Sequence, residues 1–201
     1  TLDFKGFGVS CNQSYTKQQS IINYDLGLGY YSQELELTLN SNPSLSNSES
    51  GLSAYASVNI SPKHLRSLTG RLFYDFTLQY NFKTNYDFET YDTEISSAQI
   101  TIAPKYYFSK NDAKINPFLG ASIGAVLLNY SYRDNTNILF QNIDSSDTKV
   151  IYGFEMGAQI LTNFEFTLSY YPDYKFDIFI DDMNTLNSRF KNLNFKLGYK
   201  L

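Results

Sequence analysis

The sequence predicts an all-β protein, an antiparallel up-and-down transmembrane β-barrel of ten strands, with eight strands as the second choice. Three observations predict it: apolar residues recur at every second position, the alternating segments are long, and polar connections separate them. A tilted strand needs about 9 to 11 residues to cross a bilayer, whereas the strands of globular domains average about 5 to 6 residues. We expect a single domain over residues 1–201.

The stretch from Ala98 to Tyr132 shows this pattern most fully, because it forms one hairpin with two long arms. On the first arm, Ile100 and Ile102 share one side of the pleat, and Thr101 lies on the other. A polar connection at residues 109–114 separates this arm from a second alternating arm. The period of two along both arms predicts strands that are apolar on one face only.

The same alternation predicts the other strands. The first one contains a bulge or a glycine bend, because its parity switches part of the way along. In chain order, the predicted strands cover residues 2–11, 22–30, 35–39, 52–60, 72–83, 98–108, 117–129, 150–160, 164–180 and 192–201. Ten is an even number, as single-chain bacterial barrels require when both chain ends lie on one side.

The predicted connections alternate between short and long. Short turns are expected at residues 32–33, 109–116 and 162–163, with the connection at 62–70 as an exception. Long loops are expected at residues 40–50, 84–94 and 132–148. Because external loops of such barrels are the longer ones, and loops on a rigid frame carry binding function, we expect these three loops to contact partners.

Composition excludes several classes of protein. The net charge is −4 and the basic residues are scattered, so we expect no nucleic-acid partner. The mean hydropathy is −0.33, and the longest apolar run, Ala125–Leu128, is far shorter than the roughly 20 residues of a spanning helix. One cysteine, Cys11, allows no internal disulfide, and one histidine allows no His-rich metal site. We expect no cofactor and no metal, and an export signal that processing has removed.

Two segments carry a family resemblance. They read Leu-Gly-Leu-Gly-Tyr-Tyr-Ser-Gln-Glu-Leu-Glu-Leu at residues 26–37 and Ile-Asn-Pro-Phe-Leu-Gly-Ala-Ser-Ile-Gly-Ala at residues 115–125. The pattern of these two segments resembles that of the small bacterial outer-membrane β-barrel proteins of the OmpA/OmpX type. The last strand, residues 193–201, is similar to the C-terminal strand that the barrel-assembly machinery recognises in that group, although it ends in Leu201 instead of Phe.

The resemblance implies a location in the outer membrane of a Gram-negative cell after export through the periplasm. It also implies contact with outer-membrane lipid and lipopolysaccharide, and it allows an envelope protein partner at the external loops. It implies no specific activity.

Several functions remain open. We expect a non-enzymatic surface scaffold for adhesion or docking in the envelope, with a narrow channel for ions or small solutes as the alternative. A soluble ligand-binding barrel would reverse the two faces of every strand. Nucleophilic catalysis needs a base beside the nucleophile. The one histidine, His64, is expected to be a solvated turn residue, and Cys11 a small apolar residue of the first strand.

A group of charged residues lies on the parity that we assign to the interior. Ten strands make a barrel only modestly wider than eight, so long side chains can meet across the bore. Buried charges must be paired and hydrogen-bonded, and we therefore expect a charge network that closes the bore. Its predicted members are Glu34, Glu36, Arg71, Asp75, Lys105, Glu155, Glu165 and Lys196.

Overall fold

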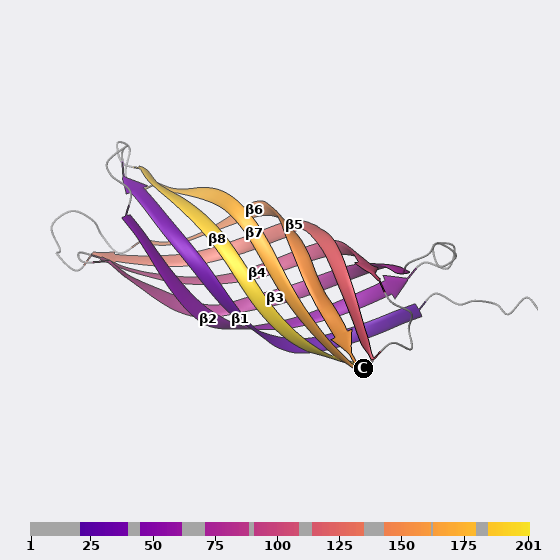
Figure 1. The fold of residues 1–201 in the computed structure, drawn as a ribbon. Helices are drawn as coiled ribbons and strands as arrows, with labels where there is room; N and C mark the ends of the chain where they lie inside the picture. Colours follow the sequence, from indigo (N-terminus) through magenta and orange to yellow (C-terminus); the bar gives the residue numbers. More distant parts are fainter. Residues whose placement is uncertain are drawn as a thin grey trace, which may run out of the picture.

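The computed structural model of the chain describes residues 21–39, 45–61, 71–88, 91–108, 114–134, 143–161, 163–179 and 185–201. Eight long strands contain nearly all of these residues (Figure 1). They are β1 (Ile21–Leu39), β2 (Leu45–Ser61), β3 (Arg71–Phe88), β4 (Tyr91–Tyr107), β5 (Ile115–Asp134), β6 (Ile143–Ile160), β7 (Phe164–Phe179) and β8 (Thr185–Lys200). Within these ranges, no helix is long and apolar enough to cross a membrane.

The eight strands close into one barrel, because each strand pairs with the next in sequence and β8 pairs back with β1. Every pairing is antiparallel. The β1–β8 register sets Asp25 opposite Lys200, so β1 begins and β8 finishes at the same end of the barrel. We call this the terminal end and the opposite one the distal end.

The first-choice count of ten strands is wrong, and the second choice of eight is confirmed. The strand predicted at residues 2–11 lies outside the described residues. The strands predicted at residues 22–30 and 35–39 are one strand, because β1 continues through Ser32 and Gln33. Both residues are paired on either side, with Ser32 opposite Ser50 of β2 and Leu193 of β8.

In the terminal half of the barrel, outward side chains are apolar and inward ones are polar. On β5, for example, Leu119 and Ile123 are 51% and 60% exposed, whereas Ser122 between them is 4% exposed. The same arrangement on all strands forms a continuous outward belt, which we call the membrane band. Its larger members include Tyr24, Leu26, Leu28, Tyr30, Leu52, Phe76, Leu78, Tyr80, Ile100, Ile102, Leu119, Ile123, Leu127, Val150, Tyr152, Phe154, Phe166, Tyr170, Phe195 and Leu197. An exposed apolar surface of this extent requires hydrocarbon around it.

In the distal half of the barrel, this polarity is reversed. The ten-strand prediction placed Leu35 and Leu37 on the lipid-facing side. In the structure they are 0% and 2% exposed and lie inside the barrel. They belong to a buried cluster, the distal core, of Leu35, Leu37, Tyr86, Ile95, Val126, Leu128, Tyr130, Tyr132, Ile151, Tyr171, Tyr174, Phe176 and Phe190. An apolar interior beneath a polar surface is how proteins fold in water, so the distal half is suited to water and not to lipid.

The three segments predicted as long loops are mostly strand. The described strands include residues 45–50 of the first segment, 84–88 and 91–94 of the second, and 132–134 and 143–148 of the third. Two bulges, between Asn81 and Thr84 on β3 and between Tyr171 and Tyr174 on β7, shift the alternation where the membrane band ends. Polar residues occur on these extended hairpins because water, and not lipid, surrounds them.

The distal half is also divided into two sheets. Among the described residues, β2 pairs with β3 only over Ser53–Ile60, and β6 pairs with β7 only over Phe154–Ile160. The other six pairings extend into the distal half. One sheet therefore contains β3 to β6 and the other β7, β8, β1 and β2, with the distal core between them. Figure 1 shows these two groups of strands diverging at the distal end.

Candidate functional site

Lys105 of β4 lies at the centre of a charge cluster inside the terminal half. Its ammonium nitrogen is 2.5 Å from a carboxylate oxygen of Asp75, 2.9 Å from one of Glu165 and 3.5 Å from one of Glu155. All four side chains are 5% exposed or less. Strand alternation explains the arrangement, because each residue occupies an inward position between lipid-facing neighbours.

Two further lysines extend this cluster. The Nζ atom of Lys196 is 3.5 Å from Glu155, and that of Lys200 is 3.1 Å from Glu165. The hydroxyl of Tyr107 donates a hydrogen bond of 2.8 Å to Glu165. Buried ions are costly unless each has a partner, so these mutual contacts are what allows the charges to occupy the interior.

The structure brings five of the eight predicted bore residues together. They are Asp75, Lys105, Glu155, Glu165 and Lys196. The assignment of Glu34 and Glu36 to the bore is corrected, because continuous β1 directs both outward in the distal half. Their carboxylates lie 3.1 Å from Lys191 and 3.7 Å from Arg189 on the outer surface. Arg71 is the first residue of β3, and its side chain lies outside the described part of the structure.

Sequence reasoning missed three members of the interior. Lys200 shares its parity with Lys196, and Asp25 precedes the lipid-facing Leu26, so both could have been found from the alternation. Tyr107 gave no such signal, because an aromatic residue near the end of a predicted strand is typical of an interfacial girdle.

Two glycines make room for a tyrosine beside the cluster. A Cβ atom at Gly27 would lie 2.6 Å from the ring of Tyr55, and one at Gly198 would overlap its hydroxyl oxygen. The ammonium of Lys196 is 5.6 Å from the centre of this ring. Glycine is therefore needed at both positions for the close approach of Tyr55.

A layer of amide side chains crosses the bore on the distal side of the charges. Gln79 Nε2 donates to Asn81 Oδ1 at 2.7 Å and to Asn194 Oδ1 at 3.2 Å. Gln79 Oε1 accepts a bond of 3.0 Å from Gln99, and Asn81 donates one of 2.8 Å to Ser97. These five residues are 3% exposed or less. A water-filled path would expose the side chains that line it, so these residues close the bore at this level.

Tyrosines form the next layer. The hydroxyl of Tyr86 donates to Gln33 Oε1 at 3.0 Å, and Gln33 Nε2 donates to the hydroxyl of Tyr174 at 3.2 Å. The hydroxyls of Tyr31 and Thr84 are 2.5 Å apart. Tyr86 and Tyr174 also belong to the distal core, which continues beyond this layer. Charges, amides, tyrosines and an apolar core thus fill the described interior in succession.

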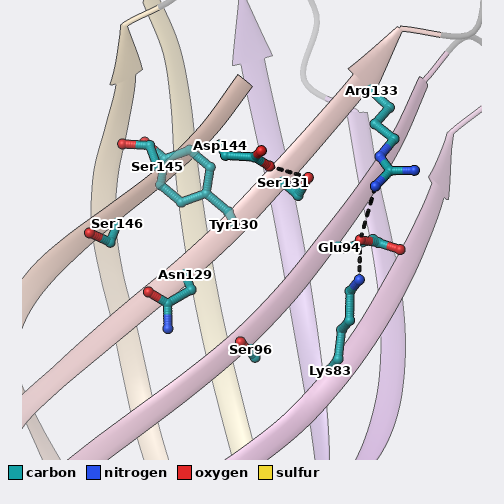
Figure 2. A pocket seen from close by; sticks show the side chains of 10 residues that line it. All are labelled: Lys83, Glu94, Ser96, Asn129, Tyr130, Ser131, Arg133, Asp144, Ser145 and Ser146. Atoms are coloured by element: carbon teal, nitrogen blue, oxygen red, sulfur yellow. Dashed lines mark hydrogen bonds and ion pairs between the residues drawn. The ribbon is translucent and has the colours of Figure 1, made fainter. Parts of the chain in front are cut away.

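The outer surface of the distal half carries paired charges and a polar pocket. Figure 2 shows Glu94 between Lys83 and Arg133, with the Arg133 pair at 4.0 Å, and Asp144 accepting a hydrogen bond from Ser131. The pocket has a volume of about 560 Å³. Its lining is Lys83, Glu94, Ser96, Asn129, Tyr130, Ser131, Arg133, Asp144, Ser145 and Ser146. Hydroxyl, amide, carboxylate and cationic groups are chemically suited to binding a polar partner.

Comparisons with known proteins agree with the fold. No protein-family model matches the sequence, and no curated protein matches it. Among solved structures, the chain is similar to the attachment invasion locus protein Ail of Yersinia pestis, with a TM-score of 0.50 and 12% identity over 88% of this chain and 98% of Ail. Neisserial surface protein A has a TM-score of 0.46 and 17% identity over 89% and 97% of the two chains. The outer membrane protease OmpT of Escherichia coli has a TM-score of 0.43 and 9% identity over 92% and 98%.

The closed barrel, its membrane band and the polar outer surface of its distal half together define an integral β-barrel of the small outer-membrane class, as the sequence predicted. The closed eight-stranded barrel has the architecture of Ail, and the membrane band supplies the lipid-facing surface that such barrels require. The bacterial outer membrane stays the location predicted from the sequence, and the membrane band agrees with a lipid bilayer around the barrel. At these identities the likeness concerns the fold alone.

Proposed function

We propose that the protein is a non-enzymatic surface scaffold, whose distal half projects from the outer membrane and docks or adheres to a partner. The observation that carries the proposal is the reversal of polarity along the barrel. Beyond Tyr30 and Phe82, the outward side chains are polar and the interior is a soluble-protein core. Nearly half of each long strand thus stands in water, which a barrel built only to cross the membrane does not need.

The packed interior favours a scaffold over a narrow channel. Lys105, Gln79 and Tyr86 belong to three successive layers, and each is 2% exposed or less. Conduction would require these hydrogen-bonded layers to open together. The channel remains the second candidate, and steady ion current through the purified barrel would favour it.

The proposal includes no catalytic step. The only histidine of the chain is His64, which lies outside the described residues, so a nucleophile activated by histidine would depend on this one position. Turnover of a peptide or of lipid A by the purified protein, lost in His64→Ala, would overturn this part of the proposal.

The lipid partners proposed are those that surround such a barrel. The membrane band contacts acyl chains, and Lys83 stands outward one residue beyond Phe82. Lys191, Arg189 and Arg133 also stand outward, farther toward the distal end. These positions suit the phosphate groups of lipopolysaccharide. Co-purification of lipopolysaccharide with the wild-type protein, reduced when the four cations are replaced by glutamine, is the expected result.

Site-specific crosslinking in intact envelopes tests the docking role. A photo-reactive residue at Asn129, on the distal surface, should form a crosslink to another protein. The same residue at Ile123, six positions earlier on β5 and in the membrane band, should crosslink only to lipid. The absence of protein crosslinks at Asn129 and at Ser146 would overturn the proposal.

A further inference from the structure

Three buried polar side chains lie on neighbouring strands at the edge of the charge cluster. They are Asp25 of β1, Asn59 of β2 and Asp75 of β3, and they are 2%, 1% and 2% exposed. Asn59 is paired with Asp75 in the β2–β3 register, and its Nδ2 donates a hydrogen bond to Asp25 Oδ2. The three side chains therefore share one part of the bore. We call them the Asp-Asn-Asp group.

Each side chain of this group has one oxygen atom without a donor. Asp25 Oδ1, Asn59 Oδ1 and Asp75 Oδ1 are buried, and none of them has a hydrogen-bond partner among the described residues. Buried polar atoms are almost always paired, because an unpaired one loses its hydration without replacement. The three atoms cannot satisfy one another, since amide and carboxylate oxygens only accept hydrogen bonds. A group that carries positive charge or hydrogen-bond donors is required beside them.

The engaged atoms of Asn59 and Asp75 show where the free ones point. Asn59 directs Nδ2 toward β1, so its Oδ1 is directed away from β1 and toward β3. Asp75 directs Oδ2 toward Lys105 of β4, at 2.5 Å, so its Oδ1 is directed away from β4 and toward β2. Because β2 and β3 are neighbours, two unpaired acceptors face each other across their ladder. Asp25 adds a third acceptor from the β1 side.

The described interior of the terminal half carries one more negative charge than positive charges. Its four carboxylates are Asp25, Asp75, Glu155 and Glu165, and its three ammonium groups are Lys105, Lys196 and Lys200. Asp25 is the one carboxylate of this set without an ion-pair partner among the described residues. Lys200 stands opposite Asp25 in the β1–β8 register, but its Nζ atom lies 3.1 Å from Glu165. Because an unpaired buried charge is strongly unfavourable, the surplus requires one more cation.

The chemistry of the Asp-Asn-Asp group selects the kind of cation. Carboxylate and amide oxygens favour hard cations that bind oxygen ligands. Ca²⁺ takes about 6 to 8 such ligands, and its double charge would reverse the surplus instead of cancelling it. The described residues contain no cluster of three or more His, Cys, Asp or Glu side chains suited to a metal ion. A monovalent cation cancels the surplus and matches a site with few carboxylates.

We propose that Asp25, Asn59 and Asp75 bind one alkali-metal cation, Na⁺ or K⁺, in the terminal half of the bore. The three free oxygens coordinate the cation, which compensates Asp25 and completes the charge cluster. Asn23, the next inward residue of β1 toward the terminal end, is only partly buried and stands opposite Asn59 in the β1–β2 register. The cation therefore reaches its ligands from the water at the terminal end without crossing the amide layer.

Thermal unfolding of the full chain in detergent micelles tests the proposal, with Na⁺, K⁺ or the large organic cation N-methylglucamine as the chloride salt. At equal ionic strength, Na⁺ or K⁺ should raise the melting temperature of the wild type by at least roughly 4 °C over N-methylglucamine, which is too large for the bore. Asp25→Asn removes the surplus charge and keeps the side-chain shape, so it should melt at the same temperature in all three salts. In N-methylglucamine it should melt above the wild type, a gain that the loss of a purely structural contact would not give. Asp173→Asn, on the distal surface, is the control and should respond to the salts as the wild type does.

Two results of this experiment would overturn the proposal. Equal melting of the wild type in the three salts would mean that a proton or water, and not a metal cation, satisfies the Asp-Asn-Asp group. Lower melting of Asp25→Asn than of the wild type in every salt would mean that a cationic side chain already compensates Asp25. Sodium NMR of the same micelles gives a direct readout of binding. The wild type and Asp173→Asn should broaden the sodium resonance more than Asp25→Asn does, and equal line widths would contradict the proposal.

Discussion

Lys105 and Asp75 form a buried ion pair of 2.5 Å between neighbouring strands, and both side chains are 2% exposed. The same ammonium also contacts Glu155 and Glu165. One cation thus compensates three carboxylates from β3, β6 and β7, and it holds together strands that are distant from one another around the barrel.

Replacement of this cation should be severely destabilising. Lys105→Met keeps most of the side-chain volume but leaves buried carboxylates without their shared partner, and removal of one partner of a buried pair costs about 3 to 5 kcal/mol. Urea unfolding in detergent, followed by the change in gel mobility, measures the loss. Lys191→Met is the control, because the pair of Lys191 with Glu34 is about 41% exposed and contributes little. Equal unfolding midpoints for the two variants would contradict the account of the charge cluster.

The distal core should respond to truncation as the core of a soluble protein does. Phe190 is 0% exposed, and its ring centre is 4.7 Å from that of Phe176 and 5.5 Å from that of Tyr174. Phe190→Ala should lower the free energy of unfolding by about 3 to 5 kcal/mol. Leu28→Ala, at a lipid-facing position that is 69% exposed, should cost much less. A larger loss at Leu28 than at Phe190 would show that the reversed polarity of the distal half is wrong.

The boundary of the membrane band can be located on a single strand. Ile123→Arg places a charge on the lipid face, where arginine near the midplane costs about 2 to 4 kcal/mol. Asn129→Arg also places an arginine on the outer face of β5. Because this position lies beyond the distal limit of the membrane band, refolding should tolerate the charge. The yield of refolding into lipid vesicles compares the two. Similar yields would mean that the band does not end between these positions.

Alternation predicted the class of fold, because lipid and a polar interior impose a period of two on every strand. It also predicted most of the charge cluster, since Lys105, Glu155 and Lys196 alternate with lipid-facing residues. Such a signal is available wherever the environment stays the same along a strand.

The strand count failed where the environment changes along one strand. On β1, the apolar parity shifts by one between Leu28 and Leu35, and the polar Ser32 and Gln33 lie at the shift, so the sequence suggested a turn. The cause is the passage from lipid into water, which moves apolar side chains from the outer to the inner face. The same passage makes the strand residues 84–88 and 91–94 as polar as a loop, and no local pattern distinguishes the two cases.

The central claim is that the barrel is a sealed scaffold, and single-channel recording in planar lipid bilayers tests it most directly. A purified porin added to the same bilayers serves as the conducting reference. The account predicts that the wild-type protein gives no steady conductance under conditions in which the porin does. Stable, ion-selective current through the wild-type barrel would contradict the account and would favour the channel over the scaffold as the function.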